Sequence, residues 1–415
     1  MNNNARPCRI AINAQLQRGQ MGGIETAVTE TIHALGKLSE ASGADDEYLI
    51  VGPGEDFEWL QPFLCGNQQL VRGILPSDRR PDASPLDAAG GTDFFATLDC
   101  DAVHFPFQAY AHCNVPTIYS PHDLQHLHFP QFFNAAQLSF RAAIHELAYR
   151  ESNTVVVATR WVARDVIAHY RLPAEKVQVI TWAPPVLGGS DVSSATLAAV
   201  REKFDLRRPF ALYPAATWEH KNHLRVLEAV QQLRAEGKSP IQLICTGQQT
   251  PHYKQIETRR RQLGLEDAVK FLGRVPGEEL RALYRLARFV FIPTLFEAAS
   301  APLFEAWREG VPVACADVTS LPEQAGDAAL LFDSASTGAI AQAFHRMQTD
   351  DGLRDLLLAN GQRRLGAFSW DKTARAYRAV YRRATGRALD EEEHALLAAM
   401  NGRGTQASDG GSELK

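Results

Sequence analysis

The stretch that decides the fold is FVFIPTLFEAASAPLFEAWREGVPVACA, residues 289–316. It begins with a short apolar run and ends with another, and the segment between them has helical character. Pro302 suits the first turn of that helix, because proline lacks the N–H that would be unpaired there. A strand, a helix and a second strand in this order predict two parallel strands joined by a crossover helix.

The same alternation runs along most of the chain. A first series of short apolar runs, with helical stretches between several of them, reads RIAINA, YLIVG, AVHFPF, TIYSP and TVVVAT. A second series reads FALYPA, QLICTG, VKFLG, FVFIPT, PVACAD and ALLFD. Alternating strands and helices predict an α/β protein with a doubly wound parallel sheet in each half.

Two segments interrupt this pattern. Residues 182–196 are rich in Pro, Gly and Ser and predict an interdomain linker. Residues 66–93 have little periodicity and many turn-forming residues, so we expect a surface loop there. Two halves joined by one linker leave a cleft between them. Because ligands of open α/β sheets bind at the carboxyl ends of strands, we expect the site in that cleft.

The composition narrows the class of protein. The 415 residues carry a net charge of −5, which gives no general reason to expect nucleic acid as a partner. The six cysteines are scattered without a C-x-x-C pair, which favours reduced thiols in a cytosolic protein over a disulfide framework or a zinc site. We expect no signal peptide and no membrane-spanning helix, since long apolar segments are absent.

Glu297 and Glu305 stand eight residues apart around the start of the helix that Pro302 opens. Helix-start N–H groups and the helix dipole favour the binding of an anion, and a phosphate is the expected ligand. Glu305 could then accept hydrogen bonds from a ribose diol, and Glu297 could face the group beyond the phosphate. On spacing alone, Glu305 could equally complement the dipole and Glu297 could be a solvated loop charge.

Three other segments bear on this choice. Lys221 stands at the start of a helix, where the dipole disfavours a cation, so it is a candidate for neutralising a diphosphate. Gly22 and Gly23 follow the first strand and would let the backbone approach an anion or a sugar. A simple loop is the plainer interpretation of that Gly-Gly pair. His122, at the carboxyl end of a strand, is interpreted as a substrate contact.

Two metal interpretations are set aside. His122, Asp123, His126 and His128 lie close in sequence, but they share neither one helical face nor a standard zinc spacing. The D-x-D of Asp99 and Asp101 precedes its strand, away from the expected site, and is interpreted as structural. No metal site is predicted.

These segments, taken together, resemble the retaining glycosyltransferases of family 4, which have the GT-B fold: two Rossmann-like domains facing each other across a cleft. The resemblance covers about residues 8–388, and its pieces follow the family's order. They are the Gly-Gly loop, HDLQHLHFP (122–130), VVVATRWVARDV (155–166), HKN (220–222), FLGRVPGEELRALYRLARFVFIPTLFEA (271–298), PLFEAWREGVPV (302–313) and TSLPEQAGDAALLFD (319–333).

The resemblance implies a domain division. Residues 1–188 would form an acceptor-side domain, completed by a C-terminal helix at about 371–388 that crosses back onto it. Residues 196–370 would bind the donor. Residues 389–415 would form a tail that starts as a helix and is partly disordered.

The resemblance also implies roles for single residues. Glu305 would bind the ribose of a nucleotide-sugar donor, Glu297 the hydroxyls of the transferred sugar, and Lys221 the diphosphate. Glu297, His122 and Lys221 would form the catalytic set, with His122 at the reacting sugar. Gly22 and Gly23 would flank the diphosphate or the acceptor. The remaining donor contacts would come from Gly273, Arg274, Ala299, Ser300, Ala301, Pro302 and Leu303.

The implied activity is that of a retaining hexosyltransferase that needs no metal and no cofactor besides its nucleotide-sugar co-substrate. GDP-mannose is the expected donor, and a surface polysaccharide or its lipid-linked precursor is the expected acceptor. We expect a cytoplasmic protein, with peripheral contact at the inner face of the membrane as an open alternative. That contact would use the basic helix near 372–387, unless its apolar face packs on the first domain.

The chain departs from the family pattern at two places. The common F-E-G-F-G-L-P is FEAASAP here, with Ala298 to Ala301 in place of the glycines and apolar residues. The arginine that often precedes the lysine is absent from residues 215–219, and His220, Arg225 or Arg274 could replace it. Two rival classes therefore stay open: another GT-B enzyme, such as a phosphorylase or an epimerase, and a degenerate binding protein without catalysis.

Overall fold

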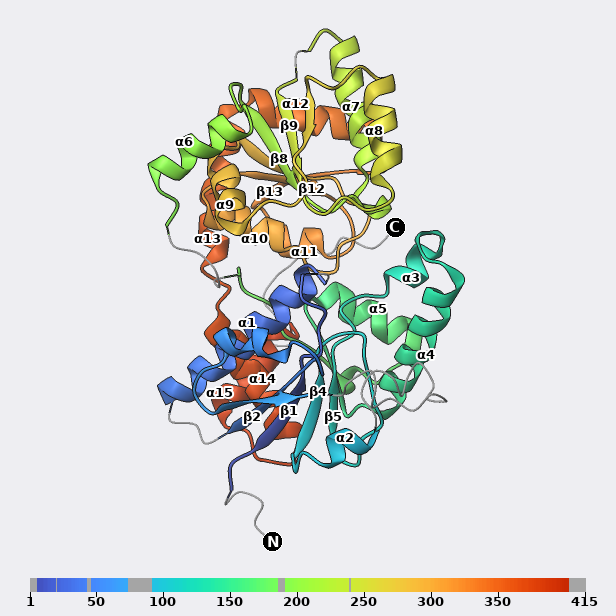
Figure 1. The fold of residues 1–415 in the computed structure, drawn as a ribbon, viewed down its shortest axis with the longest axis vertical. Coiled ribbons are helices and arrows are strands. Elements are labelled where there is room, and N and C mark those ends of the chain that lie inside the picture. The colour runs from blue at the N-terminus through green and yellow to red at the C-terminus, as the bar shows by residue number, and fades with distance from the viewer. Residues whose placement is uncertain are drawn as a thin grey trace. The chain divides into compact units, whose positions relative to one another are not determined.

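The computed structural model describes residues 6–19, 21–42, 46–73, 92–185, 191–238 and 240–402. The chain divides into two compact units (Figure 1). Unit 1 comprises Met1–Trp182 and Trp370–Lys415, and unit 2 comprises Ala183–Ser369. Each unit contains one parallel sheet with helices on both faces, which confirms the predicted α/β class.

The sheet of unit 1 has the strand order β3-β2-β1-β4-β5-β6-β7, and neighbouring strands run parallel. The strands are β1 (Arg9–Asn13), β2 (Glu47–Gly52), β3 (Gln68–Arg72), β4 (Ala102–Phe105), β5 (Thr117–Tyr119), β6 (Thr154–Val157) and β7 (Val177–Val179). Strand order reverses between β1 and β4, so the carboxyl ends of these two strands flank the place where a ligand of such a sheet is expected.

Helices cover both faces of this sheet, as two neighbouring residues of β5 show. Ile118 belongs to the core cluster formed with α1 (Gly23–Ser42) and α14 (Trp370–Ala384). The hydroxyl of Tyr119 lies 3.0 Å from Nδ1 of His145 on α4 (Ala135–Glu151). Successive strand residues point to opposite faces, so α1 and α14 lie on one face and α4 on the other. The other helical segments are η1 (Phe57–Phe63), α2 (Thr92–Ala96), α3 (Gln125–His128), η4 (Pro130–Phe132), α5 (Arg160–Tyr170), η5 (Ala174–Lys176) and α15 (Glu391–Met400).

The prediction of a surface loop at 66–93 is wrong for its first part. Residues 68–72 form β3, an edge strand that pairs with β2, and α2 begins at Thr92. The strand QQLVR lacks a buried apolar run because only one of its edges is paired and its side chains are half exposed. Residues 74–91 lie outside the described parts of the chain.

The sheet of unit 2 has the order β10-β9-β8-β11-β12-β13, again parallel. Its strands are β8 (Phe210–Pro214), β9 (Gln242–Thr246), β10 (Val269–Phe271), β11 (Phe289–Ile292), β12 (Val313–Ala316) and β13 (Ala329–Phe332). Its helices are α6 (Ser194–Lys203), η6 (Glu219–Lys221), α7 (His223–Ala235), α8 (Tyr253–Gln262), α9 (Gly277–Leu286), α10 (Ala301–Arg308), α11 (Leu321–Ala325), α12 (Thr337–Thr349) and α13 (Asp351–Leu365).

Two core clusters lie on opposite faces of this second sheet. Val290 of β11 packs with α9 and α10, whereas its neighbours Phe289 and Phe291 pack with α7 and α12. The strands are therefore apolar on both sides, which explains the continuous apolar runs in the sequence. Strand order reverses between β8 and β11, and the loops after these two strands carry Lys221 and Glu297.

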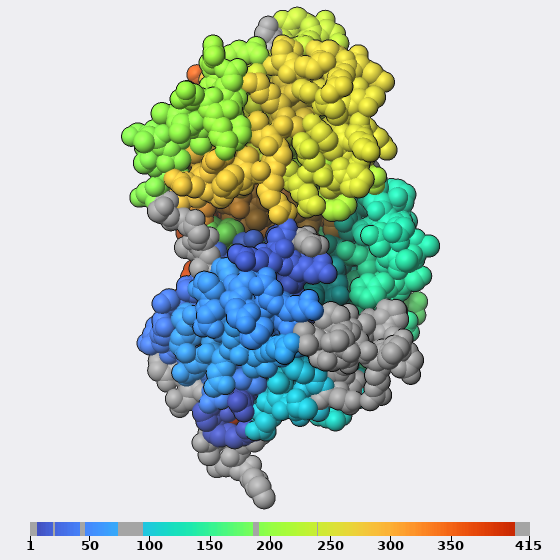
Figure 2. Space-filling model, in the orientation of Figure 1, coloured from blue at the N-terminus to red at the C-terminus, as the bar shows by residue number. Residues whose placement is uncertain are grey.

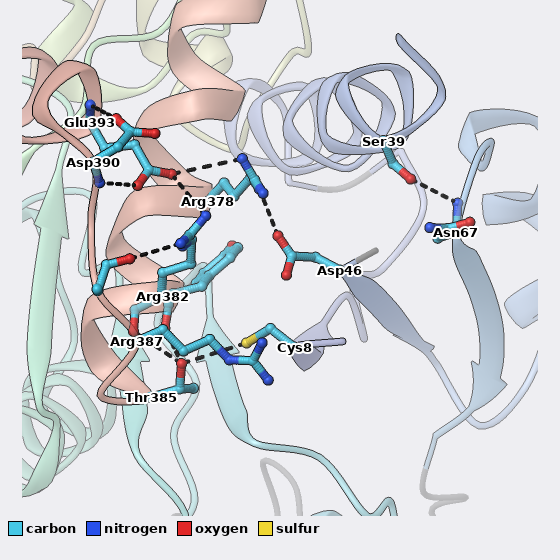
Figure 3. A network of polar contacts seen from close by, with 12 residues as sticks. Cys8, Ser39, Asp46, Asn67, Arg378, Arg382, Thr385, Arg387, Asp390 and Glu393 are labelled. Atoms are coloured by element: carbon cyan, nitrogen blue, oxygen red, sulfur yellow. Dashed lines mark hydrogen bonds and ion pairs between the residues drawn. The ribbon is translucent and has the colours of Figure 1, made fainter. Parts of the chain in front are cut away.

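The C-terminal helix α14 packs on unit 1 through its apolar face, where Tyr377, Val380 and Tyr381 are buried. Its basic residues are held by acidic partners (Figure 3). Arg378 Nε lies 2.6 Å from Asp46 Oδ2, and Arg378 and Arg382 both approach Glu393 of α15, at 3.7 and 3.6 Å. The apolar side of this helix is therefore used in the core of unit 1 and is not available to a bilayer. Among the helices of the described ranges, none has the length and apolar composition that a membrane crossing requires.

Candidate functional site

Lys221 and Glu297 form an ion pair at the switch point of the unit 2 sheet. Lys221 Nζ lies 2.7 Å from Glu297 Oε2, and the two side chains are only 19% and 15% exposed. The residues are 76 positions apart in sequence, and they meet because β8 and β11 are neighbours in the sheet. The site thus places one cation against one carboxylate at the carboxyl ends of both strands.

The loop that carries Lys221 is held by Asn222, which adopts a left-handed conformation with φ 63° before α7 begins. The Asn222 side-chain amide donates to the carbonyls of Pro293, at 3.0 Å, and Ser334, at 2.9 Å. The Tyr213 hydroxyl donates to the Lys221 carbonyl at 2.5 Å. These buried bonds position the lysine backbone from both neighbouring strands.

The backbone of Glu297 is fixed from the loop after β12. The Glu297 N–H donates to Thr319 Oγ1 at 3.0 Å. The hydroxyls of Thr319 and Ser320 both donate back to the Glu297 carbonyl at 2.6 Å. The Glu297 carboxylate is therefore carried by a turn that these hydrogen bonds hold in place, and not by a freely solvated loop.

The helix α10 begins at Ala301, with Ser300 as its N-cap and Pro302 in its first turn, as predicted. The Ser300 N–H donates to Gln324 Oε1 at 2.9 Å, and its buried hydroxyl has no hydrogen-bond partner among the described residues. Ala299 is half-buried beside it. The side chain of Leu303 is fully buried in the core, so only its backbone could reach a ligand.

Glu305 lies one turn further along α10 and receives a hydrogen bond from Tyr284 of α9, with 2.6 Å between Oη and Oε2. Burial raises the pKa of Glu305, while this hydrogen bond and nearby Arg308 oppose the rise. Oε1 remains as a second acceptor on the same carboxylate. A carboxylate held in one orientation by a tyrosine is suited to accept hydrogen bonds from a diol.

Gly273 and Arg274 follow β10 on the same edge of the sheet. Gly273 has φ 69°, which favours glycine, and its carbonyl accepts a hydrogen bond from Gly247 N at 2.9 Å. Arg274 is exposed and reaches Gln248 Oε1 at 3.5 Å. The loops after β9 and β10 are thus joined beside the loop that carries Lys221.

The three candidates for the missing arginine differ in what they can offer. Burial and nearby Lys221 lower the pKa of His220 to about 2, so this ring is neutral and cannot replace a cation. Arg225 already donates to Asn222 Oδ1 and to the Ser334 carbonyl. Arg274 has an exposed guanidinium that also contacts Gln248, so His220 is the one candidate of the three that its charge rules out.

In unit 1, Gly22 and Gly23 lie at the start of α1, after β1. Gly22 has φ 54°, and a Cβ added at either glycine would meet no atom of the described residues within 4 Å. The backbone here faces open space and is accessible to an external group.

His122 follows β5, and its Nε2 lies 2.6 Å from the carbonyl of Pro106, which follows β4. Burial lowers the pKa of His122, so the ring is neutral and Nε2–H donates to that carbonyl. Nδ1 then carries a lone pair and can accept a hydrogen bond. The ring lines a cavity of about 10 Å³ together with His104, Trp182 and Tyr377.

The remaining members of the histidine-rich segment separate in the fold. Asp123 pairs with Arg141 at 3.3 Å, and the buried His126 stacks on His145 with ring centroids 5.1 Å apart. His128 instead contacts Asp165. The structure therefore does not unite His122, Asp123, His126 and His128. Asp101 pairs with Arg6 and Arg387, in line with its structural interpretation.

Sequence reasoning assigned no role to four residues that shape this site, namely Tyr284, Thr319, Ser320 and Gln324. All four lie within motifs quoted above, so a signal was present. Their contacts join loops and helices that follow different strands, and spacing along the chain does not reveal such contacts.

Comparison with known families identifies the class of protein. The model described as "Glycosyltransferase Family 4" matches residues 21–181, and the model described as "Glycosyl transferases group 1" matches residues 198–364. Together they span most of both units. The chain belongs to the GT-B glycosyltransferases of family 4 type.

Several relatives are sugar transferases. The O-antigen chain mannosyltransferase B of Escherichia coli is 28% identical over 270 residues, covering 62% of this chain and 68% of that protein. The serotype-specific mannosyltransferase WbdA of Escherichia coli is 23% identical over 74% of this chain, but only 37% of that protein is matched. The D-inositol 3-phosphate glycosyltransferase of Salinispora tropica is 26% identical over 82% of this chain and 72% of that protein.

Solved structures share the fold at low identity. Anabaena Alr3699/HepE, in complex with UDP and glucose, superposes with a TM-score of 0.67 at 16% identity, covering 90% of this chain and 99% of that one. WaaG, a glycosyltransferase involved in lipopolysaccharide biosynthesis, gives a TM-score of 0.64 at 16% identity, covering 91% and 100%. These similarities confirm the GT-B fold.

Proposed function

We propose that the protein transfers mannose from GDP-mannose, with retention of configuration, to a polysaccharide or lipid-linked glycan. The observation that carries the proposal is the Lys221–Glu297 pair at the switch point, with Glu305 on the helix that follows. The two Escherichia coli mannosyltransferases support mannose, and the nucleotide bound by Alr3699/HepE supports a nucleotide-sugar donor.

The charges of the pair suggest what donor binding does. Without a ligand, Lys221 and Glu297 neutralise each other in a partly buried place. A diphosphate brings more negative charge than one carboxylate, so it competes for Lys221. Glu297 is then released to accept hydrogen bonds from the sugar hydroxyls, while Glu305 accepts them from the ribose.

The proposed chemistry is a front-side displacement. The bond between the anomeric carbon and the diphosphate oxygen breaks, and the acceptor oxygen forms its bond on the same face. The departing phosphate takes the acceptor proton. Lys221, the amides at the start of α10 and Arg274 stabilise the leaving diphosphate electrostatically, so we propose that neither a metal nor another cofactor is needed.

His122 would hold the reacting sugar through Nδ1, because Nε2 is committed to the Pro106 carbonyl. As a neutral ring, it can accept from a hydroxyl without adding charge to the transition state. Gly22 and Gly23 would let the diphosphate or the acceptor approach the backbone at the start of α1.

The proposal includes a cytoplasmic location, with access to a lipid-linked acceptor at the inner face of the membrane. The related O-antigen chain mannosyltransferase supports envelope glycans as products. Since the apolar face of α14 is buried, membrane contact would need other surfaces. Sedimentation with anionic vesicles at low salt tests this part, and protein that stays in the supernatant removes it.

The deciding experiment measures nucleotide release from GDP-mannose, UDP-glucose and ADP-glucose with a mannose-terminated acceptor. We expect turnover with GDP-mannose, and an α-linked product by the anomeric proton signal. Lys221→Ala and Glu305→Ala should abolish it. Lys238→Ala removes an exposed lysine that is also paired with a glutamate at 2.7 Å, and it should leave turnover unchanged.

The other readings predict different results. A phosphorylase would turn over with inorganic phosphate and no nucleotide. A degenerate binding protein would show no thermal shift with any nucleotide at millimolar concentration, because a ligand of the folded state must raise the melting temperature. Turnover with a UDP-sugar alone would keep the class and reject the donor.

A further inference from the structure

A cluster of three potential metal ligands joins α3 to α5 in unit 1. His128 is the last residue of α3, while Asp165 and His169 stand four residues apart on α5 and so share one helix face. His128 Nε2 lies 2.8 and 2.9 Å from the two carboxylate oxygens of Asp165. His169 Nδ1 lies 3.2 Å from Asp165 Oδ1. One ligand atom from each residue falls within 4.8 Å of the others.

We propose that these three side chains bind a divalent transition-metal ion of the zinc class. Two imidazole nitrogens and one carboxylate oxygen are ligands that zinc prefers, and three protein ligands plus water are a common arrangement. With metal–ligand bonds of about 2.0–2.2 Å, neighbouring ligand atoms of a tetrahedron lie roughly 3.3–3.5 Å apart. The observed 2.8 and 3.2 Å are shorter by about 0.1–0.7 Å, so these two contacts must lengthen by that amount when an ion enters between them.

Burial in the cluster suits an ion that enters from solvent. The Asp165 side chain is only 7% exposed, whereas those of His128 and His169 are 29% and 39% exposed. The carboxylate would thus supply negative charge from within the protein, and the open side would hold water. The chain segment that contains α3 lies at the surface of unit 1, where Figure 2 shows it in teal.

The cluster can also exist without an ion. His128 Nε2–H would then donate to the carboxylate, and His169 Nδ1–H would donate to the Asp165 backbone carbonyl, which lies 2.9 Å away. This arrangement accounts for each histidine separately. The same contacts also bring the two ring nitrogens and one carboxylate oxygen, from two different helices, within 4.8 Å of one another, which is the convergence that an ion between them requires.

The ion would hold the end of α3 against α5. It would therefore stiffen the segment from His122 to His128, which links β5 to this cluster. The binding proposal stands on the three ligands alone and is independent of whether His122 contacts a sugar.

The test is a titration of the full chain, freed of metal with a chelator, with Zn²⁺ against a chromogenic zinc indicator. We expect one ion per chain in the wild type, and at least tenfold weaker binding in His128→Gln, Asp165→Asn and His169→Gln. His112→Gln is the matched control, because His112 forms an exposed pair with Glu151 at 2.8 Å in the same unit. Its zinc affinity should equal that of the wild type.

Two further readouts do not depend on catalysis. Zn²⁺ should raise the melting temperature of the wild type but not that of His169→Gln, a change at an exposed end of α5 that should leave the fold intact. Co²⁺ should give the visible absorption of a four-coordinate site in the wild type and not in Asp165→Asn. Absence of stoichiometric binding by the wild type overturns the proposal, as does equal zinc affinity in the wild type and all three ligand variants.

Discussion

Acid should destabilise unit 1 strongly, because several of its histidines are buried and neutral. His104 is the clearest case, since burial holds its folded-state pKa at about 3, with nearby His122 adding to the shift. Its Nδ1 lies 2.8 Å from the Tyr381 hydroxyl, and its Nε2 lies 3.0 Å from Ser120 Oγ. Burial also lowers the pKa values of His122, His126 and His145.

The size of the effect follows from linkage between protonation and folding. The unfolded chain binds a proton on His104 with a pKa of about 6.5, whereas the folded unit does not bind it until about pH 3. The contribution of His104 to the free energy of unfolding is therefore fully present above pH 6.5, and it is lost as the pH falls from 6.5 towards 3. Between pH 7 and pH 5, one such histidine costs about 2 kcal/mol. Total stabilities are about 5–15 kcal/mol, so a few such groups suffice to unfold a unit.

The assay is urea unfolding at pH 7 and pH 5, followed by tryptophan fluorescence, for the wild type and His104→Gln. Glutamine cannot titrate but keeps a polar group near Tyr381 and Ser120. We expect the variant to be less stable at pH 7, and this shift identifies the transition of unit 1. The difference between the two pH values should be smaller by about 2 kcal/mol in the variant.

His112→Gln, at an exposed position, serves as the control and should retain the pH dependence of the wild type. An unchanged difference between pH 7 and pH 5 in His104→Gln would refute the reasoning, because it would mean that the folded unit accepts the proton. The absolute stability of the variant does not enter this comparison, so a general loss of packing cannot imitate the result.

Three further predictions concern single contacts. Glu297→Gln should bind GDP several-fold more tightly while losing transfer, because Lys221 is freed; equal or weaker GDP binding by calorimetry would contradict this. Tyr284→Phe removes the hydrogen bond that opposes the raised pKa of Glu305, so the KM for the donor should rise several-fold at neutral pH while kcat changes little. Arg378→Ala leaves Asp46 and Glu393 without this partner and should destabilise unit 1 by about 1–3 kcal/mol in urea unfolding, whereas the exposed Arg375→Ala should cost less than about 1 kcal/mol.

The central strands were predictable because a strand that is buried on both faces needs apolar side chains at every position, which gives a continuous apolar run in the sequence. FVFI of β11 and VACA of β12 are fully buried, and Pro302 marks the start of the helix between them. The edge strand QQLVR gives no such signal, since one edge of β3 is unpaired and half of its surface faces solvent. Apolar runs therefore predict the central strands of a sheet but not a half-exposed edge strand such as β3.

Candidate residues were predictable one at a time, but their contacts were not. Lys221 and Glu297 were each identified from their local setting, yet the ion pair between them depends on β8 and β11 being neighbours. The spacing of His128 from His122 and His126 argued against a metal site. The fold instead brings His128 to Asp165, which stands 37 residues away on another helix.

The two units share a way of holding the loops that carry the candidate residues. His122 in unit 1 and Asn222 in unit 2 both have left-handed backbones, with φ 64° and 63°. Each donates a buried side-chain hydrogen bond to the carbonyl of a proline that directly follows a strand at the switch point, Pro106 after β4 and Pro293 after β11. A left-handed residue other than glycine costs about 1–2 kcal/mol, and a buried hydrogen bond returns about that amount. These turns therefore add little net stability. They instead fix the direction of the chain at the edge where ligands of such sheets bind. This orients His122 in one unit, and in the other it orients Lys221, the residue directly before Asn222.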